Sequence, residues 1–579
     1  MTVASQISRS IPNSAARARR TKAVRGEQRP SPMNTGKYVA YRPLGLPDRT
    51  WPARRLDSAP VWASVDLRDG NQALIDPMDC DRRRTMFDLL IALGFKEIEV
   101  GYPTASRDDH DFVRHLIQTD AVPDDVVIQV MAPIIGDFIE RTGAALAGAR
   151  RAIVQVFNPT SAMQRRLVFH KSRAELAALA LHGAEQALRL QDSLPGTEIF
   201  LQYAPESFTQ TEPEFALEIC NAVLDFWAPR AENTLAINLP ATVEVYPPQE
   251  FADRIEYMSR HLAHRERVQL SVHPHNDRGC AVAAAEMAVL AGANRVEGTL
   301  FGNGERTGNV CLITLALNLF AQGVDPMLDL RDLDGIRRVV EHCTRMTVGQ
   351  RHPWVGDFVY TSFAGTHQDA IAKGLQARGQ SADGVWEVPY LPIDPHDIGR
   401  DYQALIRINS QSGKGGIAHL LRTEYGVELP RRLQIDLAAA MQQVCETTGG
   451  EMTAGELWRH FDTRYVQPGI GAVLDHIDDA SETTADAAHM LAAHEVDGVV
   501  QELTVGTLSG AGARLGTVYA CCEVFHDGRL FWGVGLAGTR DRAVRAAVRS
   551  VANQVHAACG LCRSAADRPY EIRQSSELS

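Results

Sequence analysis

Long apolar runs are missing from this 579-residue sequence, and so is an excess of basic residues. No stretch reaches the roughly 18 apolar residues that a membrane-spanning helix needs. The 59 Lys and Arg residues are outnumbered by 71 Asp and Glu residues, which gives a formal net charge of -12. Proteins that bind duplex nucleic acid usually concentrate basic residues on one face. We therefore predict a soluble protein with neither a membrane nor a nucleic acid as its partner.

Cysteine is also sparse, with ten residues scattered along the chain. This usage is typical of a reducing compartment, so we predict a cytoplasmic protein. Cys559 and Cys562 form a C-x-x-C pair, but no second pair accompanies it and no βαβ unit follows, so we interpret them as ordinary thiols. The glycine-rich stretches at residues 302–308 and 412–416 lack the spacing of a phosphate-binding loop. We expect the first to shape a loop at a site and the second to form a turn.

Residues 1–36 differ from the rest of the chain. Six arginines lie there among Ser, Ala and Pro, and Glu27 is the single acidic residue. Such a composition cannot build a hydrophobic core, which predicts a disordered tail. Two further interpretations are an organelle transit peptide and a true start of the protein at Met33. Residues 37–60 are then expected to form an N-terminal arm.

Between residues 61 and 335 the sequence alternates short β-branched or apolar runs with helical patterns. This alternation predicts parallel strands joined by crossover helices, an α/β fold. Eight strands are expected, at residues 62–67, 97–101, 126–131, 152–157, 198–203, 235–239, 268–272 and 295–300. Eight is the number of strands that closes a (β/α)₈ TIM barrel, and we predict this fold.

The first crossover illustrates the local signals. Asp79 is a helix cap, the apolar positions that follow recur at helical spacing, and Gly94 stops the helix. Residues 82–84 are three arginines in the first turn, where positive charge opposes the helix dipole. We expect them to form a solvated face.

After about residue 335 the alternation fades. Residues 336–480 mix helical patterns with Pro-rich loops and are expected to form α+β linker subdomains. Residues 481–495 are small and polar and separate off a shortened C-terminal α+β domain, residues 481–579. That domain should contain a hairpin across Asp527-Gly528, followed by a helix at about residues 540–558.

Active sites of parallel barrels lie at the carboxyl ends of the strands. His273 and His275 are two residues apart on the seventh expected strand, so both imidazoles should point into the barrel mouth. Only the eighth strand separates them from the first strand, which ends near Asp69, and the loop with Asn309 lies nearby. Two imidazoles and a carboxylate predict a divalent metal site with open coordination positions.

Arg68 precedes Asp69, and both side chains can face inward only if the chain turns there, which Gly70 would permit. A guanidinium beside a metal ion suits a 2-oxo acid. Its ketone oxygen and carboxylate can chelate the ion, while Arg68 stabilises negative charge that builds on the ketone oxygen.

Three strings, LRDGNQ at 67–72, HPHND at 273–277 and GNGERTGN at 302–309, resemble the 2-isopropylmalate synthase family. So do NLPATVE at 238–244, GTHQDAI at 365–371 and VPYLPIDP at 388–395. The resemblance covers about residues 37–480. It implies condensation of acetyl-CoA with a 2-oxo acid, for which 2-oxoisovalerate is the first candidate. It also implies Asp69, His273 and His275 as ligands of Mg²⁺, or alternatively of Mn²⁺ or Zn²⁺, with Asn309 close by.

The same resemblance assigns Arg68 and Thr242 to the 2-oxo acid. It assigns Glu206, His367 and Tyr390 to the acetyl-CoA half of the reaction, with proton abstraction by Glu206 and His367. In the family the last two reach the barrel of a partner subunit, so a homodimer is implied.

Three positions of the expected acyl pocket depart from the family pattern. Gln155 stands where His is usual, and Met131 and Ala204 stand where Leu and Ser are expected. Alternatives therefore stay open: a related synthase for another 2-oxo acid, a lyase on the same barrel, or a binding paralogue without activity. A metal-dependent TIM-barrel hydrolase is the least favoured, because its ligands usually come from more strands.

Overall fold

The computed structural model describes residues 41–231, 233–362, 365–378, 384–400, 414–448, 452–466, 484–508 and 516–559. The chain divides into a short N-terminal unit, Met1–Leu44, and a second unit, Gly45–Ser579. The predicted disordered tail at residues 1–36 and the alternative start at Met33 lie outside the described residues.

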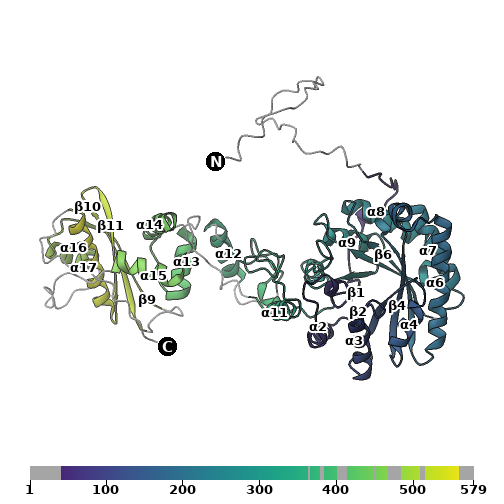
Figure 1. The fold of residues 1–579 in the computed structure, drawn as a ribbon. Helices are drawn as coiled ribbons and strands as arrows, with labels where there is room; N and C mark the ends of the chain where they lie inside the picture. Colours follow the sequence, from purple (N-terminus) through teal and green to yellow (C-terminus); the bar gives the residue numbers. More distant parts are fainter. Residues whose placement is uncertain are drawn as a thin grey trace, which may run out of the picture. The chain divides into compact units, whose positions relative to one another are not determined.

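Eight parallel strands close into a barrel in the order β1-β2-β3-β4-β5-β6-β7-β8, which confirms the predicted TIM barrel. Figure 1 shows the strands encircled by helices. The strands are β1 (Val61–Ser64), β2 (Glu97–Gly101), β3 (Val127–Pro133), β4 (Arg151–Pro159), β5 (Glu198–Glu206), β6 (Leu235–Ala241), β7 (Val268–Pro274) and β8 (Arg295–Gly298). Strand β1 ends at Ser64, earlier than expected, because the chain already turns before Arg68.

Each barrel strand is followed by a helix that covers the outside of the barrel. These helices are α2 (Cys80–Leu93), α3 (Arg107–Gln118), α4 (Phe138–Leu146), α6 (Arg173–Ser193), α7 (Pro213–Trp227), α8 (Pro248–His261), α9 (Ala281–Leu290) and α10 (Leu312–Phe320). Two short helices, α1 (Asp69–Gln72) and α5 (Ala162–Gln164), and the π-helix η3 (Arg165–Phe169) interrupt the connections after β1 and β4.

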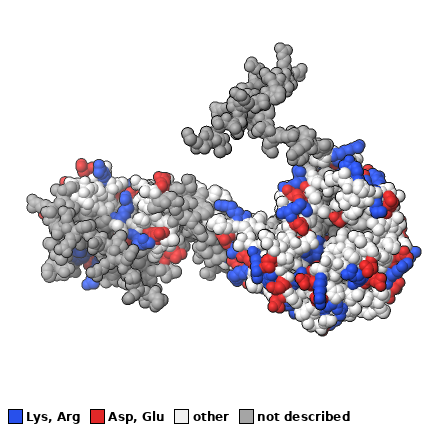
Figure 2. Space-filling model, in the orientation of Figure 1, with Lys and Arg blue, Asp and Glu red and all other residues white. Residues whose placement is uncertain are grey.

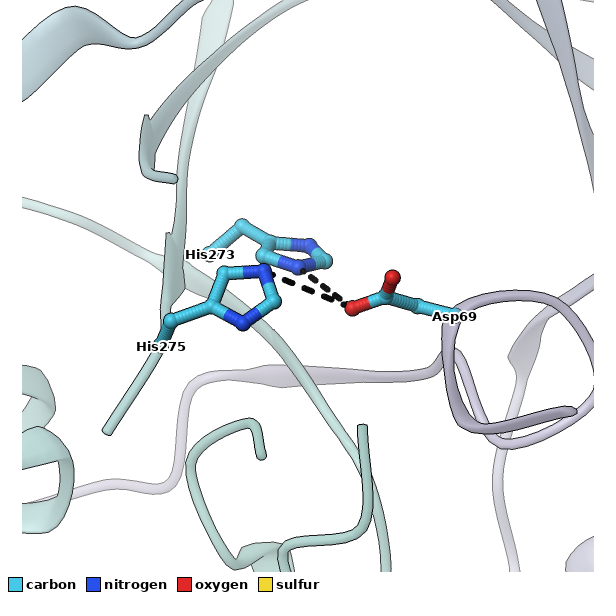
Figure 3. A group of neighbouring side chains, drawn as sticks. All are labelled: Asp69, His273 and His275. Atoms are coloured by element: carbon cyan, nitrogen blue, oxygen red, sulfur yellow. Dashed lines mark ion pairs between the residues drawn. The ribbon is translucent and has the colours of Figure 1, made fainter. Parts of the chain in front are cut away.

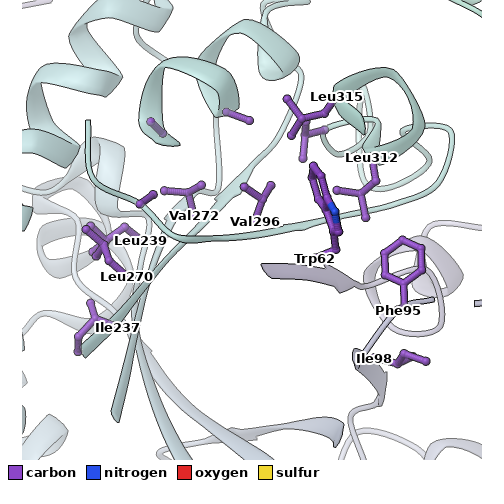
Figure 4. Close-up of a cluster of buried hydrophobic side chains, with 14 of the residues drawn as sticks. Trp62, Phe95, Ile98, Ile237, Leu239, Leu270, Val272, Val296, Leu312 and Leu315 are labelled. Atoms are coloured by element: carbon purple, nitrogen blue, oxygen red, sulfur yellow. The ribbon is translucent and has the colours of Figure 1, made fainter. Parts of the chain in front are cut away.

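The hydrophobic core lies between the strands and the helices. Figure 4 shows Ile237 and Leu239 of β6, Leu270 and Val272 of β7, and Val296 of β8 in this layer. Every residue of β6 is buried, because one face of the strand meets the helices and the other faces the barrel interior. Alternate residues on such a strand point inward, so the polar Asn238 between two apolar residues is an interior position.

The predicted signals of the first crossover are confirmed, with one correction. Asp79 caps α2 by accepting a hydrogen bond from the backbone N–H of Arg82, and Gly94 ends the helix with φ of 101°. The expectation of a solvated arginine face holds for Arg84 but is wrong for Arg82 and Arg83, which are buried. Arg82 donates to the carbonyl of Cys343, and Arg83 forms an ion pair with Asp109 at 2.9 Å. The bonds with these partners, which are distant in the sequence, offset the cost of burying the two charges.

The N-terminal arm is described from residue 41. Trp51 is buried against α8, where its indole N–H donates to Asp253 at 2.7 Å. The part of the arm around Trp51 therefore packs on the outside of the barrel.

Beyond the barrel, the residues that the structure describes up to position 466 are mainly helical. The helices are α11 (Leu333–Thr344), α12 (Gly365–Arg378), α13 (Lys414–Tyr425), α14 (Arg431–Thr448) and α15 (Ala454–Phe461). The packing divides the expected linker region. Residues up to Ile398 join the core of the barrel, whereas α13 to α15 share a core with the C-terminal sheet. Lys414 begins α13, so the glycine-rich stretch there is in part helical and not simply a turn.

The C-terminal domain contains α16 (Thr484–Ala493), β9 (Val499–Thr507), β10 (Val518–His526), β11 (Arg529–Ala537) and α17 (Arg540–Ala558). The hairpin at Asp527-Gly528 and its following helix are confirmed, and both turn residues have positive φ. The small, polar stretch that was expected to be a separator instead forms α16, which packs on α17.

Among the described residues, the helices fall short of the length and apolarity that crossing a membrane requires. Basic and acidic side chains lie interspersed over the face shown in Figure 2.

Candidate active site

Asp69, His273 and His275 come together at the carboxyl ends of the barrel strands (Figure 3). One oxygen of Asp69, Oδ2, lies 3.4 Å from Nε2 of His273 and 3.5 Å from Nε2 of His275. All three residues are buried. Strand β8 pairs with both β1 and β7, as the barrel order predicted. The end of β1, which leads to Asp69, therefore lies close to the end of β7, where His273 and His275 are found.

The protonation of this group fits a cation. Nδ1 of His273 lies 2.8 Å from Oε2 of Glu297, and in the neutral form that binds a metal ion the imidazole would donate its Nδ1 proton there. The other nitrogen, Nε2, is then an acceptor that faces the carboxylate of Asp69. Two acceptors at this distance repel unless a proton or a metal ion lies between them. The donor set of two imidazoles and one carboxylate matches Zn²⁺, Mn²⁺ or Mg²⁺.

In the ion-free protein, Asp69 and His275 have the charge states that metal ligands need, whereas His273 carries an additional proton. Burial would raise the pKa of Asp69, but Arg68 and His273 hold it well below its ordinary value, so the carboxylate is ionised. Burial and the nearby His273 lower the pKa of His275 to about 4, so its imidazole is neutral at pH 7. Burial would lower the pKa of His273, but hydrogen bonds to Asp69 and Glu297 raise it to about 9, and a bound metal ion would have to displace that proton.

Asn309 completes the surroundings of Asp69. Its Nδ2 donates to Asp69 Oδ2 at 2.7 Å, and its buried Oδ1 has no hydrogen-bond partner among the described residues. The preceding loop depends on glycine: Gly304 and Gly308 have positive φ, and a side chain on Gly308 would collide with the carbonyl of Gly302. The expectation that these glycines shape a loop at the site is confirmed.

Arg68 is fixed beside the triad by two carboxylates. Its Nε donates to Glu99 at 2.6 Å, and its Nη1 lies 3.1 Å from Asp69. Burial would lower the pKa of Arg68, but Glu99 and Asp69 raise it above its ordinary value. The chain does turn here, although Gly70 lies in helix α1 without a positive φ. A side chain at Gly70 would instead press on Thr299.

A cavity of about 270 Å³ opens beside these residues. Its lining includes every barrel residue that the sequence assigned to substrate: Arg68, Met131, Gln155, Ala204, Glu206 and Thr242. Gln155 is held by its Oε1, which accepts from Gln202 and from Asn238. Among the described residues its Nε2 has no partner, so this N–H group faces the cavity. Thr242 Oγ1 accepts from the backbone N–H of Ser207 at 2.9 Å.

Glu206 also lines the cavity, and its carboxylate forms no ion pair with a described residue. Burial raises its pKa above the ordinary 4.5, and a hydrogen bond from Gln164 opposes this shift only in part. A carboxylate with a raised pKa is a stronger base, which suits proton abstraction.

His367 and Tyr390 do not line this cavity. They lie outside the barrel, where their rings pack against each other with centroids 4.1 Å apart. Tyr390 is 61% exposed and has φ of 66°, an uncommon conformation for a tyrosine.

Several residues that organise the site were missed in the sequence. Gln129 donates to both Glu99 and Glu297, so a buried network connects Arg68 with His273. Arg295 is fully buried and pairs with Glu297 at 2.5 Å. The available signal was the polar residue at alternate positions of otherwise apolar strands, which marks the inward face of a barrel.

The fold and the site together define a class of protein, TIM-barrel enzymes with an Asp-His-His metal centre beside an arginine. A family model described as "HMGL-like" matches residues 59–340. A second, "Alpha-isopropylmalate synthase, post-catalytic domain-like", matches residues 357–422.

Relatives named 2-isopropylmalate synthase align over most of the chain. The protein of Parafrankia sp. is 56% identical over 76% of this chain and 78% of its own length. That of Thermobifida fusca is 48% identical over 91% of this chain and 99% of its own length, and that of Leifsonia xyli is 47% identical over 95% and 100%. The chain belongs to the 2-isopropylmalate synthase family, whose members transfer the acetyl group of acetyl-CoA to a 2-oxo acid.

Proposed function

We propose that this chain condenses acetyl-CoA with 2-oxoisovalerate to give 2-isopropylmalate and CoA, a step of leucine biosynthesis. The observation that carries the proposal is the Asp69, His273 and His275 triad beside Arg68 in one cavity. A divalent ion held there, Mg²⁺ first and Mn²⁺ or Zn²⁺ as alternatives, would supply Lewis acidity toward the 2-oxo acid.

The side chains of this chain would perform the remaining steps. Arg68 stabilises the negative charge that develops on the ketone oxygen, and Thr242 positions the acid. Glu206, paired with His367, removes a proton from the thioester methyl group. The resulting carbanion attacks the ketone carbon, a C–C bond forms, and water then cleaves the thioester to release CoA.

The proposal includes a homodimer. The exposed His367 and Tyr390 would enter the cavity of the partner subunit, because within one chain they do not line the cavity. Residues 61–335 would form the catalytic domain, residues 336–480 the linker, and residues 481–579 a shortened regulatory-like domain. The protein would act in the cytoplasm, in keeping with its free cysteines.

One observation favours a second candidate, a synthase for a different 2-oxo acid. Gln155 presents an N–H donor to the cavity, and Met131 and Ala204 change its volume and polarity. A misfit of one methylene group is worth about 1–3 kcal/mol of discrimination.

The test is CoA release from acetyl-CoA, followed with a thiol reagent, in the presence of Mg²⁺ or Mn²⁺ and a panel of 2-oxo acids. Leucine is added or omitted, and Asp69→Ala serves as the control. Preference for 2-oxoisovalerate, abolished in Asp69→Ala, supports the proposal. Preference for another acid selects the second candidate, and no release with any acid would favour a lyase or a binding paralogue.

A further inference from the structure

A short segment at the barrel mouth, residues 163–171, exposes apolar side chains beside cations. It follows β4 and includes the π-helix η3. Met163, Leu167 and Val168 are 53%, 59% and 61% exposed, and Phe169 is 39% exposed. Four neighbouring large apolar side chains in water are unfavourable, and such patches usually mark a binding surface.

The segment is anchored, so its side chains have a defined position. Arg165 binds Glu212 at the start of α7, with an N–O distance of 2.6 Å, and also donates to the carbonyl of Thr160. Burial would raise the pKa of Glu212, but its hydrogen bond from Arg165 lowers it to about 2, so the ion pair is intact at neutral pH. His170 ends the π-helix in a left-handed conformation, with φ of 51°.

The segment also adjoins the cavity. Gln164, directly before η3, hydrogen-bonds to the side chain of Glu206, which lines the cavity. A ligand that fills the cavity and continues outward past Glu206 therefore meets this segment.

The charge of this surface is positive within an acidic protein. Arg173 shares Glu212 with Arg165, and Glu175 caps α6 by bonding to Ser172. The carboxylates of Glu212 and Glu175 thus already have bonding partners within this surface. Arg166 and Lys171 are exposed, and the charge of Lys171 contributes to lowering the pKa of the nearby Glu175.

We propose that residues 163–171 bind the phosphate-bearing nucleotide half of acetyl-CoA. This inference rests on the proposed function, because it takes acetyl-CoA as the donor. A cavity of about 270 Å³ holds a 2-oxo acid and an acetyl group but not a nucleotide, so the nucleotide must lie outside it. Arg166 and Lys171 pair with phosphate groups, and Leu167, Val168 and Phe169 pack against the adenine ring and the pantetheine arm.

The test compares the wild-type protein with the double variant Arg166→Ala/Lys171→Ala. CoA and 3′-dephospho-CoA are titrated by calorimetry, and KM is measured for acetyl-CoA and for acetyl-pantetheine, which has no nucleotide. We expect CoA affinity to fall by about tenfold or more in the double variant. The KM for acetyl-CoA should rise in parallel, whereas the KM for acetyl-pantetheine and for the 2-oxo acid should not change. Arg189→Ala, an exposed arginine of α6 paired with Glu185, is the matched control.

Equal CoA affinity in the wild type and the double variant would overturn this inference but leave the proposed function standing. A wild type that binds no CoA would overturn both. A second variant, Leu167→Ser/Phe169→Ser, separates a subunit interface from a ligand surface. Loss of CoA affinity at unchanged mass in light scattering supports the inference. Dissociation of the oligomer at unchanged CoA affinity contradicts it.

Discussion

The guanidinium of Arg68 donates to Glu99 at 2.6 Å, and Glu99 is completely buried on the neighbouring strand. The side chain expected to bind substrate is thereby held by a residue that never reaches the cavity. Glu99 in turn connects through Gln129 to Glu297 and so to His273. The arginine and the metal site therefore share one buried support.

Replacing Glu99 by Gln should weaken substrate binding through Arg68. Its guanidinium loses a charged partner and can shift toward Asp69, so kcat/KM for the 2-oxo acid should fall by about ten- to a hundredfold, as for other supporting residues of metal sites. The KM for acetyl-CoA should change little. Glu97→Gln, on the same strand as Glu99, is the control. It breaks the ion pair with Arg295, which lies away from the cavity, and should lower the melting temperature without raising KM. Identical kinetic effects of both variants would mean that Glu99 is only structural.

Metal binding should be measurable without any assay of turnover. The wild-type protein should hold about one divalent ion per chain, and its melting temperature should rise with added metal, because the ion binds only the folded state. Asp69→Asn should lose both the ion and the stabilisation. Asp277→Asn provides a matched control, since this carboxylate at the barrel mouth pairs with Arg306. Full metal content in Asp69→Asn would remove this residue from the ligand set.

Met131→Ala should widen the cavity and alter the choice of acceptor. Removing the side chain from the lining leaves room for a longer 2-oxo acid, so the ratio of kcat/KM for such an acid to that for 2-oxoisovalerate should rise by about tenfold. Met287→Ala, on α9 outside the cavity, should leave the ratio unchanged. An unchanged ratio in Met131→Ala would show that this side chain does not touch the acyl group.

The strands and the triad were predictable because both follow from local pattern plus barrel closure. Alternating apolar runs predicted β2 to β8 to within a few residues, and strand order placed Asp69 opposite His273 and His275. The supports of the site were not predictable in this way. Whether Glu99 meets Arg68 or water depends on side-chain directions inside the closed barrel. Likewise Arg82 and Arg83 looked like surface residues because their partners, Cys343 and Asp109, are distant in the sequence.

Glu206 should govern the acid side of the pH profile. Its pKa is raised above 4.5 by burial, and the reaction needs the ionised carboxylate. The rate should therefore fall as the pH is lowered toward this pKa, and this fall should begin at a higher pH than it would with an exposed glutamate. Glu206→Gln should lower kcat by about a hundredfold or more and abolish this limb. Glu305→Gln, another carboxylate of the cavity lining, should retain it. A wild-type limb that persists in Glu206→Gln would assign the ionisation to another group.

The packed rings of His367 and Tyr390 should act on the cavity of the partner subunit. In a purified hybrid of one Asp69→Asn chain and one His367→Ala chain, one cavity has an intact Asp69 and receives an intact His367 from the other chain. Such a hybrid should show about half of wild-type activity, although each variant alone is inactive. The reciprocal hybrid combines a wild-type chain with a chain that carries both substitutions, and both of its cavities then lack one group. If His367 instead served its own chain, the activities of the two hybrids would be reversed, because the wild-type chain of the second hybrid would be complete by itself.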